Sequence, residues 1–129
     1  MNSTNSSGAR KRIAVIPGDG IGKEVIPEAV KVLRAAASSG GREVALTEFD
    51  WGADRYLRDG TTLPADAVAM LHRDFDAILL GAMGDPRVPT NIHAAEILLG
   101  LRFKLDLYVN ARPCVLFDKR FTPLKDRAE

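Results

Sequence analysis

Residues 13–37, IAVIPGDGIGKEVIPEAVKVLRAAA, carry the pattern that decides the fold. The β-branched run from Ile13 to Ile16 ends at Pro17 and predicts a short strand. A glycine-rich turn, GDGIG, follows it. Apolar residues then recur at helical spacing, which predicts an amphipathic helix over about Gly22–Ala37. A strand that passes through a tight turn into a helix is a typical opening of an α/β domain.

The alternation of strand and helix patterns continues along the chain. The expected elements are a strand at 43–49, a short helix at 64–72, a buried parallel strand at 76–81, a helix at about 93–104 that Thr90 or Asn91 caps, and a strand at 107–117. Residues 50–64 carry turn signals, and Trp51 is expected to pack in the core. This order predicts an α/β fold with a mainly parallel sheet and right-handed crossovers.

Length and composition narrow the class of protein. The 129 residues make one domain's worth of chain, and 46% hydrophobic with 27% charged residues is typical of a globular protein. A formal net charge of +1 gives no sign of nucleic-acid or membrane-surface binding, and no apolar run approaches the roughly 20 residues of a membrane span. Residues 1–10 are polar and are expected to form a disordered tail. The single cysteine, Cys114, fits a reducing, cytoplasmic compartment and is expected to pack in a strand.

Two arginines are the best candidates for ligand binding. In residues 94–113, AAEILLGLRFKLDLYVNARP, Arg102 lies one helical turn after Leu98, and Arg112 lies in the strand expected next. Guanidinium groups prefer bidentate pairing with carboxylates. The two arginines would therefore grip an anionic small molecule, with Leu98 and Leu99 as an apolar wall. The alternative is that one or both arginines pair with acidic residues at the surface.

The helix that carries Arg102 is expected to bury one apolar stripe. Its members are Ile97, Leu98, Leu101 and Leu105. Strand alternation would place Arg112 on the same face as Tyr108 and Asn110, opposite Leu107, Val109 and Ala111.

The remaining polar residues give no catalytic pattern. The turn PGDGIG lacks the dinucleotide-binding spacing, because Lys23 stands where the third glycine is required, so a tight turn and a ligand-facing loop both stay open. Asp19, Asp85, Asp106 and His93 read as isolated residues, and no pair has metal-ligand spacing.

Four motifs together resemble one family. IAVIPGDGIGKEV, AILLGAMGDP, LGLRFKLDLYVNARP and FTPLKD are similar, in this order, to segments of the isocitrate and 3-isopropylmalate dehydrogenases, the β-decarboxylating dehydrogenases. The resemblance covers the chain after the tail. It implies that residues 11–129 are the N-terminal part of the family's first domain, an incomplete α/β/α sandwich.

The resemblance also implies a chemistry. The family oxidises a 2-hydroxy diacid with NAD or NADP and releases CO2 with the help of Mg2+ or Mn2+. Arg102 and Arg112 match arginines that bind the malate part of the substrate. Ile21 matches a residue that touches the cofactor's adenosine, and the loop at Gly84 with the following helix start matches the region that meets the nicotinamide.

The helix before Arg102 is where family members select their substrate. Its apolar residues, with Leu98 among them, suit an alkyl group and favour 3-isopropylmalate, the substrate of leucine biosynthesis. Some family members carry a glutamate at the position of Ala95, whereas this chain has Glu96 one residue later, which we treat as a candidate cofactor contact. Isocitrate, malate and tartrate-type substrates therefore stay open.

By this resemblance, the catalytic tyrosine and lysine, the third substrate arginine and the metal-binding aspartates would all follow Glu129. We therefore expect no catalytic and no metal-binding residue in the chain, and no redox activity from it alone. A homodimer is expected for a full-length parent, with a dicarboxylate as its small-molecule partner. A shortened relative that serves as a binding or regulatory subunit is the competing interpretation.

Overall fold

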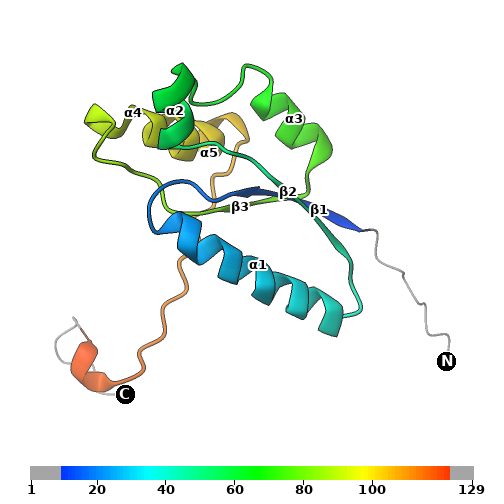
Figure 1. Ribbon diagram of the computed structural model, residues 1–129. Helices are drawn as coiled ribbons and strands as arrows, with labels where there is room; N and C mark the ends of the chain where they lie inside the picture. The colour runs from blue at the N-terminus through cyan, green and yellow to red at the C-terminus, as the bar shows by residue number, and fades with distance from the viewer. Residues whose placement is uncertain (1–9, 123–129) are drawn as a thin grey trace.

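The computed structural model describes residues 10–122. Residues 1–9 of the expected tail and most of the FTPLKD motif therefore lie outside the described residues. Three parallel strands form one sheet in the order β2-β1-β3 (Figure 1). The strands are β1 (Lys11–Ile16), β2 (Val44–Glu48) and β3 (Ala77–Leu80). The expected strands at 13–16, 43–49 and 76–81 are thus confirmed to within a few residues.

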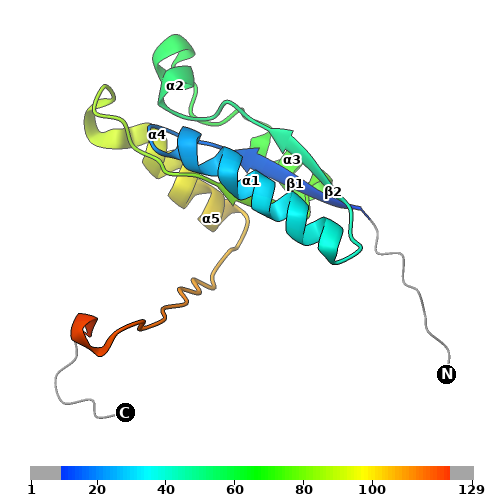
Figure 2. The ribbon, with the colours of Figure 1, turned by 60° about the horizontal axis from the view of Figure 1, so that its bottom comes forward.

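Helices cover both faces of this sheet. Helix α1 (Gly22–Ser39) lies alone on one face, and α2 (Ala53–Asp59), α3 (Ala67–Asp74) and α5 (Gly100–Lys104) lie on the other (Figures 1 and 2). This arrangement confirms the predicted α/β fold with a parallel sheet. The short helix α2 was not expected, because its sequence reads as a run of turn signals between Gly52 and Gly60.

Strand β1 is the centre of the core because it is paired on both edges. Ala14 and Ile16 are fully buried and belong to the cluster that packs under α3 and α5 with Trp51, Leu71 and Ile97. Trp51 is 2% exposed and its ring lies 4.6 Å from that of Phe49, so its expected packing role is confirmed. Successive side chains alternate across a strand, so Val15 faces the opposite side, where α1 lies.

The helical region that carries Arg102 is one continuous helix with a π-helical turn in its middle. It consists of α4 (Ile92–Ala94), a π-helical turn (Ala95–Leu99) and α5. The residues it buries are His93, Ile97 and Leu101, while Leu98 is 41% exposed. Leu98 was expected in the buried stripe, and that prediction is wrong, because Leu98 lines an open hollow at the surface instead of the core.

The expected cap of this helix differs as well. Asn91 precedes α4 with a left-handed backbone (φ 51°), and its side chain makes no cap bond. Its Oδ1 instead accepts a hydrogen bond from the backbone N–H of Asp85, at 3.0 Å. Asn91 therefore closes the loop that precedes the helix.

The strand expected at 107–117 does not form. This segment has no ladder partner among the described residues and runs away from the sheet (Figures 1 and 2). A strand needs a neighbour for its backbone groups, and none of the described strands pairs with this segment. The alternation of faces expected for Tyr108 to Arg112 therefore does not apply. Cys114, expected to pack, is exposed.

Within residues 10–122, no helix combines the length and the apolar character that a membrane crossing requires.

Candidate functional site

A buried pair, Asp19 and His93, lies at the carboxyl end of the sheet. His93 Nε2 is 2.7 Å from Asp19 Oδ2, and the two residues are 0% and 3% exposed. The sequence analysis treated both as isolated, which is wrong. They are 74 residues apart in the chain, and only the parallel sheet brings the turn after β1 beside the helix that follows β3. No spacing rule would have found this pair.

The Asp19 carboxylate ties together separate segments of the chain. Its Oδ1 accepts a hydrogen bond from the backbone N–H of Ala53 at 2.6 Å, where α2 begins. Its Oδ2 accepts one from the backbone N–H of Gly84 at 2.8 Å, in the loop after β3, besides the contact with His93. The backbone N–H of Asp19 also donates to the carbonyl oxygen of Ala82 at 2.7 Å. The glycine turn after β1 and the loop after β3 are therefore held against each other.

The protonation state of Asp19 follows from these donors. Burial by itself would raise the pKa of the Asp19 carboxyl. Hydrogen bonds from the backbone of Ala53 and Gly84 and from the imidazole outweigh burial and lower that pKa below its ordinary value. Asp19 is therefore an ionised acceptor at neutral pH.

Two glycines make the close approach of these segments possible. Gly18 has φ +76°, and a Cβ on it would lie 2.2 Å from the carbonyl oxygen of Ala82. Gly84 has φ +132°, a backbone conformation that side chains rarely adopt. The glycine-rich turn is thus required by packing against the loop after β3, whether or not a ligand faces it.

A second, exposed layer of ion pairs joins the same segments. Asp54, at the start of α2, pairs with Lys23 of α1 and with Arg87 of the loop after β3. Arg87 also pairs with Asp85 at 2.6 Å, and its hydrogen bonds lower the pKa of Asp85 to about 2. Asp85, too, was treated as isolated and is not.

Two of the three candidate cofactor residues lie at this junction. Ile21 closes the glycine turn at the start of α1 and is 65% exposed, which leaves an apolar surface free for a ligand. Gly84 is exposed as well, and its N–H is already bonded to Asp19. An exposed apolar side chain beside a rigid glycine turn fits contact with a nucleoside. The assignment of both residues to cofactor binding stays a prediction.

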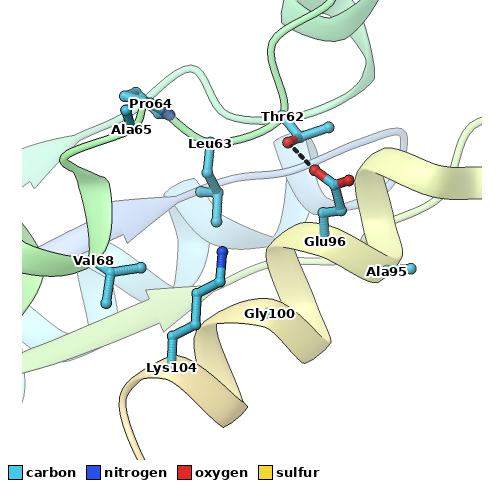
Figure 3. A pocket seen from close by; sticks show the side chains of 9 residues that line it. All are labelled: Thr62, Leu63, Pro64, Ala65, Val68, Ala95, Glu96, Gly100 and Lys104. Carbon is cyan, nitrogen blue, oxygen red and sulfur yellow. Dashed lines mark hydrogen bonds between the residues drawn. The ribbon is translucent and has the colours of Figure 1, made fainter.

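Glu96, the third candidate, lies elsewhere. It accepts a hydrogen bond from the Thr62 hydroxyl and lines a hollow of about 480 Å³ into which the Lys104 side chain extends (Figure 3). The other wall of this hollow comes from residues 62–68. The cofactor role expected for Glu96 stays a prediction.

The three candidate substrate residues share one open hollow. Arg102, Arg112 and Leu98 all line a space of about 540 Å³. Its other lining residues include apolar side chains of β3 and of the following segments, namely Ile78, Leu80, Leu101, Leu107 and Val109. Among the residues that the structure describes, no carboxylate pairs with Arg102 or Arg112, whereas Arg87, in the loop after β3, pairs with Asp54 and Asp85. The surface-pair alternative thus has no support within residues 10–122.

The turn after α5 brings Arg112 back to Arg102. Leu107 N–H donates to the carbonyl oxygen of Arg102 at 2.8 Å, and Asp106 N–H donates to that of Phe103 at 3.3 Å. Asp106 has φ 54° between these bonds, so this is the hydrogen-bond pattern of a Schellman turn. Leu101 and Leu107 line the same hollow, as the hydrophobic contact of such a turn requires. The reversal directs residues 107–112 past the end of the helix.

Metal ligands are not gathered in the described part of the chain. Residues 10–122 contain no group of three or more histidine, cysteine, aspartate or glutamate side chains that could hold an ion. These residues alone therefore do not fit a complete metal site.

Known proteins include clear relatives of this chain. The family model described as isocitrate/isopropylmalate dehydrogenase matches residues 12–129. The chain belongs to this family. A 3-isopropylmalate dehydrogenase from Corynebacterium kroppenstedtii is 53% identical over 116 residues, which are 89% of this chain and 34% of that relative. One from Thermobifida fusca is 50% identical over 113 residues, 88% of this chain and 32% of the relative.

A solved structure supports the same assignment. The apo crystal structure of a β-decarboxylating dehydrogenase from Thermococcus kodakarensis matches 76% of this chain and 27% of its own, with 38% identity and a TM-score of 0.60. The family resemblance seen in the four motifs is thereby confirmed. The chain spans about one third of the length of the relatives it matches, at 34% and 32%. The match thus corresponds to one part of those relatives.

Proposed function

We propose that this chain is the N-terminal part of a cytoplasmic, NAD-dependent oxidative decarboxylase of 3-isopropylmalate in leucine biosynthesis. The observation that carries the proposal is the shared hollow of Arg102, Arg112 and Leu98. Two guanidinium groups without a carboxylate partner among residues 10–122, set beside aliphatic walls, match a molecule that carries two carboxylates and a branching alkyl group. The relatives named 3-isopropylmalate dehydrogenase favour this substrate over others of the family.

Each residue has a distinct part in this proposal. Arg112 is exposed and Arg102 is half-buried at the helix end, so the ligand's carboxylates would enter from the open side. Leu98 lies in the π-helical turn and is 41% exposed, and it would contact the alkyl group. Ile21, Gly84 and Glu96 remain the proposed cofactor contacts, with NADP as the alternative to NAD.

The remaining chemistry is proposed to come from outside the chain. A divalent ion, Mg2+ or Mn2+, would stabilise the charge that develops on loss of CO2. Since residues 10–122 hold no complete ligand set, no step through the metal is assigned to them. A homodimer is proposed for the parent enzyme, and no redox activity for the 129 residues alone.

The test compares substrates in the protein that carries this chain. NADH formation is measured with 3-isopropylmalate, isocitrate, malate and tartrate at equal concentrations, with Mg2+ or Mn2+ present. We expect 3-isopropylmalate to give the highest kcat/KM. A higher value for isocitrate or tartrate would overturn the substrate assignment. Diacid binding without any turnover would favour the second candidate, a binding or regulatory module.

A further inference from the structure

Burial of His93 destabilises the fold unless its hydrogen bond with Asp19 compensates for the cost. His93 is fully buried, and its Nδ1 has no hydrogen-bond partner. An unpartnered polar atom in a buried site destabilises the fold, a cost that an apolar residue of similar size would avoid. The Tyr56 ring stacks on the imidazole with centroids 6.1 Å apart and offers no hydrogen bond to it. Among residues 10–122, the hydrogen-bond partner of the imidazole is Asp19.

The direction of that bond is fixed by chemistry. An ionised carboxylate can only accept hydrogen bonds, so the proton of the imidazole lies on Nε2. Nε2–H and the Gly84 N–H then donate to the same atom, Oδ2, while Oδ1 faces Ala53. His93 therefore sets the rotation of the carboxylate, and the carboxylate in turn holds Gly84 in its unusual backbone conformation.

We propose that Asp19 and His93 are a positioning pair that fixes the loop of residues 82–91 against the glycine turn of residues 17–22, so that Gly84 and Ile21 face the cofactor together. The inference rests on the proposed function, because it assigns these two segments to the cofactor. Neither residue needs to touch the cofactor, since both are buried.

The pair can be tested by ¹H–¹⁵N NMR on the full 129-residue chain in three forms, which are the wild type, His93→Leu and His93→Gln. His93→Leu fills the space but removes the donor. His93→Gln keeps an N–H near the place of Nε2 and should restore the bond. Each form is titrated with NAD+ and, separately, with 3-isopropylmalate. Changes in the backbone amide chemical shifts are followed in three segments, residues 17–22, 82–91 and 98–112.

In the wild type we expect NAD+ to shift the first two segments and the diacid to shift the third. His93→Leu should weaken the apparent NAD+ affinity about tenfold, because the binding-competent loop is less populated. Its diacid affinity should stay within about twofold of wild type, and His93→Gln should recover the NAD+ response. A general loss of stability would instead weaken the binding of NAD+ and of the diacid by similar factors.

Several outcomes would overturn the inference. They are an unchanged NAD+ response in His93→Leu, equal losses for both ligands, or no NAD+ response of residues 17–22 and 82–91 in the wild type. If His93→Leu does not fold, His93→Met replaces it, since methionine adapts to irregular space. Absence of a diacid response in residues 98–112 would instead count against the proposed function, so the two failures are distinguishable.

Discussion

Replacing Asp19 by asparagine should destabilise the chain strongly at neutral pH. Asp19 is 3% exposed and accepts hydrogen bonds at 2.6, 2.8 and 2.7 Å. The asparagine oxygen can still accept from Ala53, and His93 can change tautomer to accept from the new amide. The Gly84 N–H then faces a donor and is left unsatisfied. Loss of a hydrogen bond to a charged group costs about 1.5–3 kcal/mol, so we expect Asp19→Asn to lower the free energy of unfolding by about 3 kcal/mol.

The loss of stability in Asp19→Asn should be larger at neutral pH than in acid. The pKa of Asp19 is lowered in the folded chain, so its ionised form stabilises the fold fully above the unfolded pKa of about 3.9. That stabilisation is lost as the pH falls through the lower, folded pKa. Asparagine does not titrate. The difference in stability between wild type and variant should therefore be greatest near pH 7 and shrink below about pH 3.9.

Urea unfolding followed by circular dichroism measures both effects. Asp66→Asn serves as the control, because Asp66 is exposed and makes no side-chain cap bond at the start of α3. It should change the free energy of unfolding by no more than about 0.5 kcal/mol. A cost below about 1 kcal/mol for Asp19→Asn, or a difference that does not shrink in acid, would refute the reasoning.

Three further predictions use the same unfolding measurement. Ile97→Ala removes a fully buried side chain and should lower the free energy of unfolding by about 2–5 kcal/mol. Leu99→Ala, at a position 45% exposed, should lower it by less than about 1 kcal/mol. Equal losses would contradict the assigned faces of the π-turn. Asp106→Gly should raise stability by about 0.5–1 kcal/mol, because φ is 54° there, and a loss would contradict the left-handed turn. Gly18→Ala should cost at least about 2 kcal/mol more than Gly41→Ala, because both glycines have positive φ but only Gly18 has a backbone atom within 4 Å of the added Cβ.

The fold was largely predictable because it depends on local periodicity. Strand β1, the glycine turn and helix α1 follow from β-branched and amphipathic patterns within residues 13–37. Helix α2 was missed because its seven residues lie among glycines and aspartates that favour turns. The strand expected at 107–117 failed for a different reason. Its pattern is extended, but strand formation depends on a partner that no local pattern specifies.

The candidate site divides in the same way. Arg102 and Leu98 are one helical turn apart, as their spacing indicates. The Schellman turn at Asp106, which the sequence analysis did not predict, brings Arg112 to the same hollow. Asp19 and His93 lie 74 residues apart, and their contact arises only from the parallel pairing of β1 with β3. The π-helical turn at Ala95–Leu99 was likewise not predicted from the sequence, and Leu98 lies in the hollow and not in the core.

Direct binding of the diacid tests the central claim, that Arg102 and Arg112 form a carboxylate-binding pair. Calorimetric titration of 3-isopropylmalate into the chain should show binding that weakens at least about tenfold in Arg102→Gln and in Arg112→Gln, equivalent to about 1.4 kcal/mol or more. Arg42→Gln, at an exposed position outside the hollow, should bind as the wild type does. Binding that survives both substitutions at the hollow, or no binding by the wild type, would contradict the account.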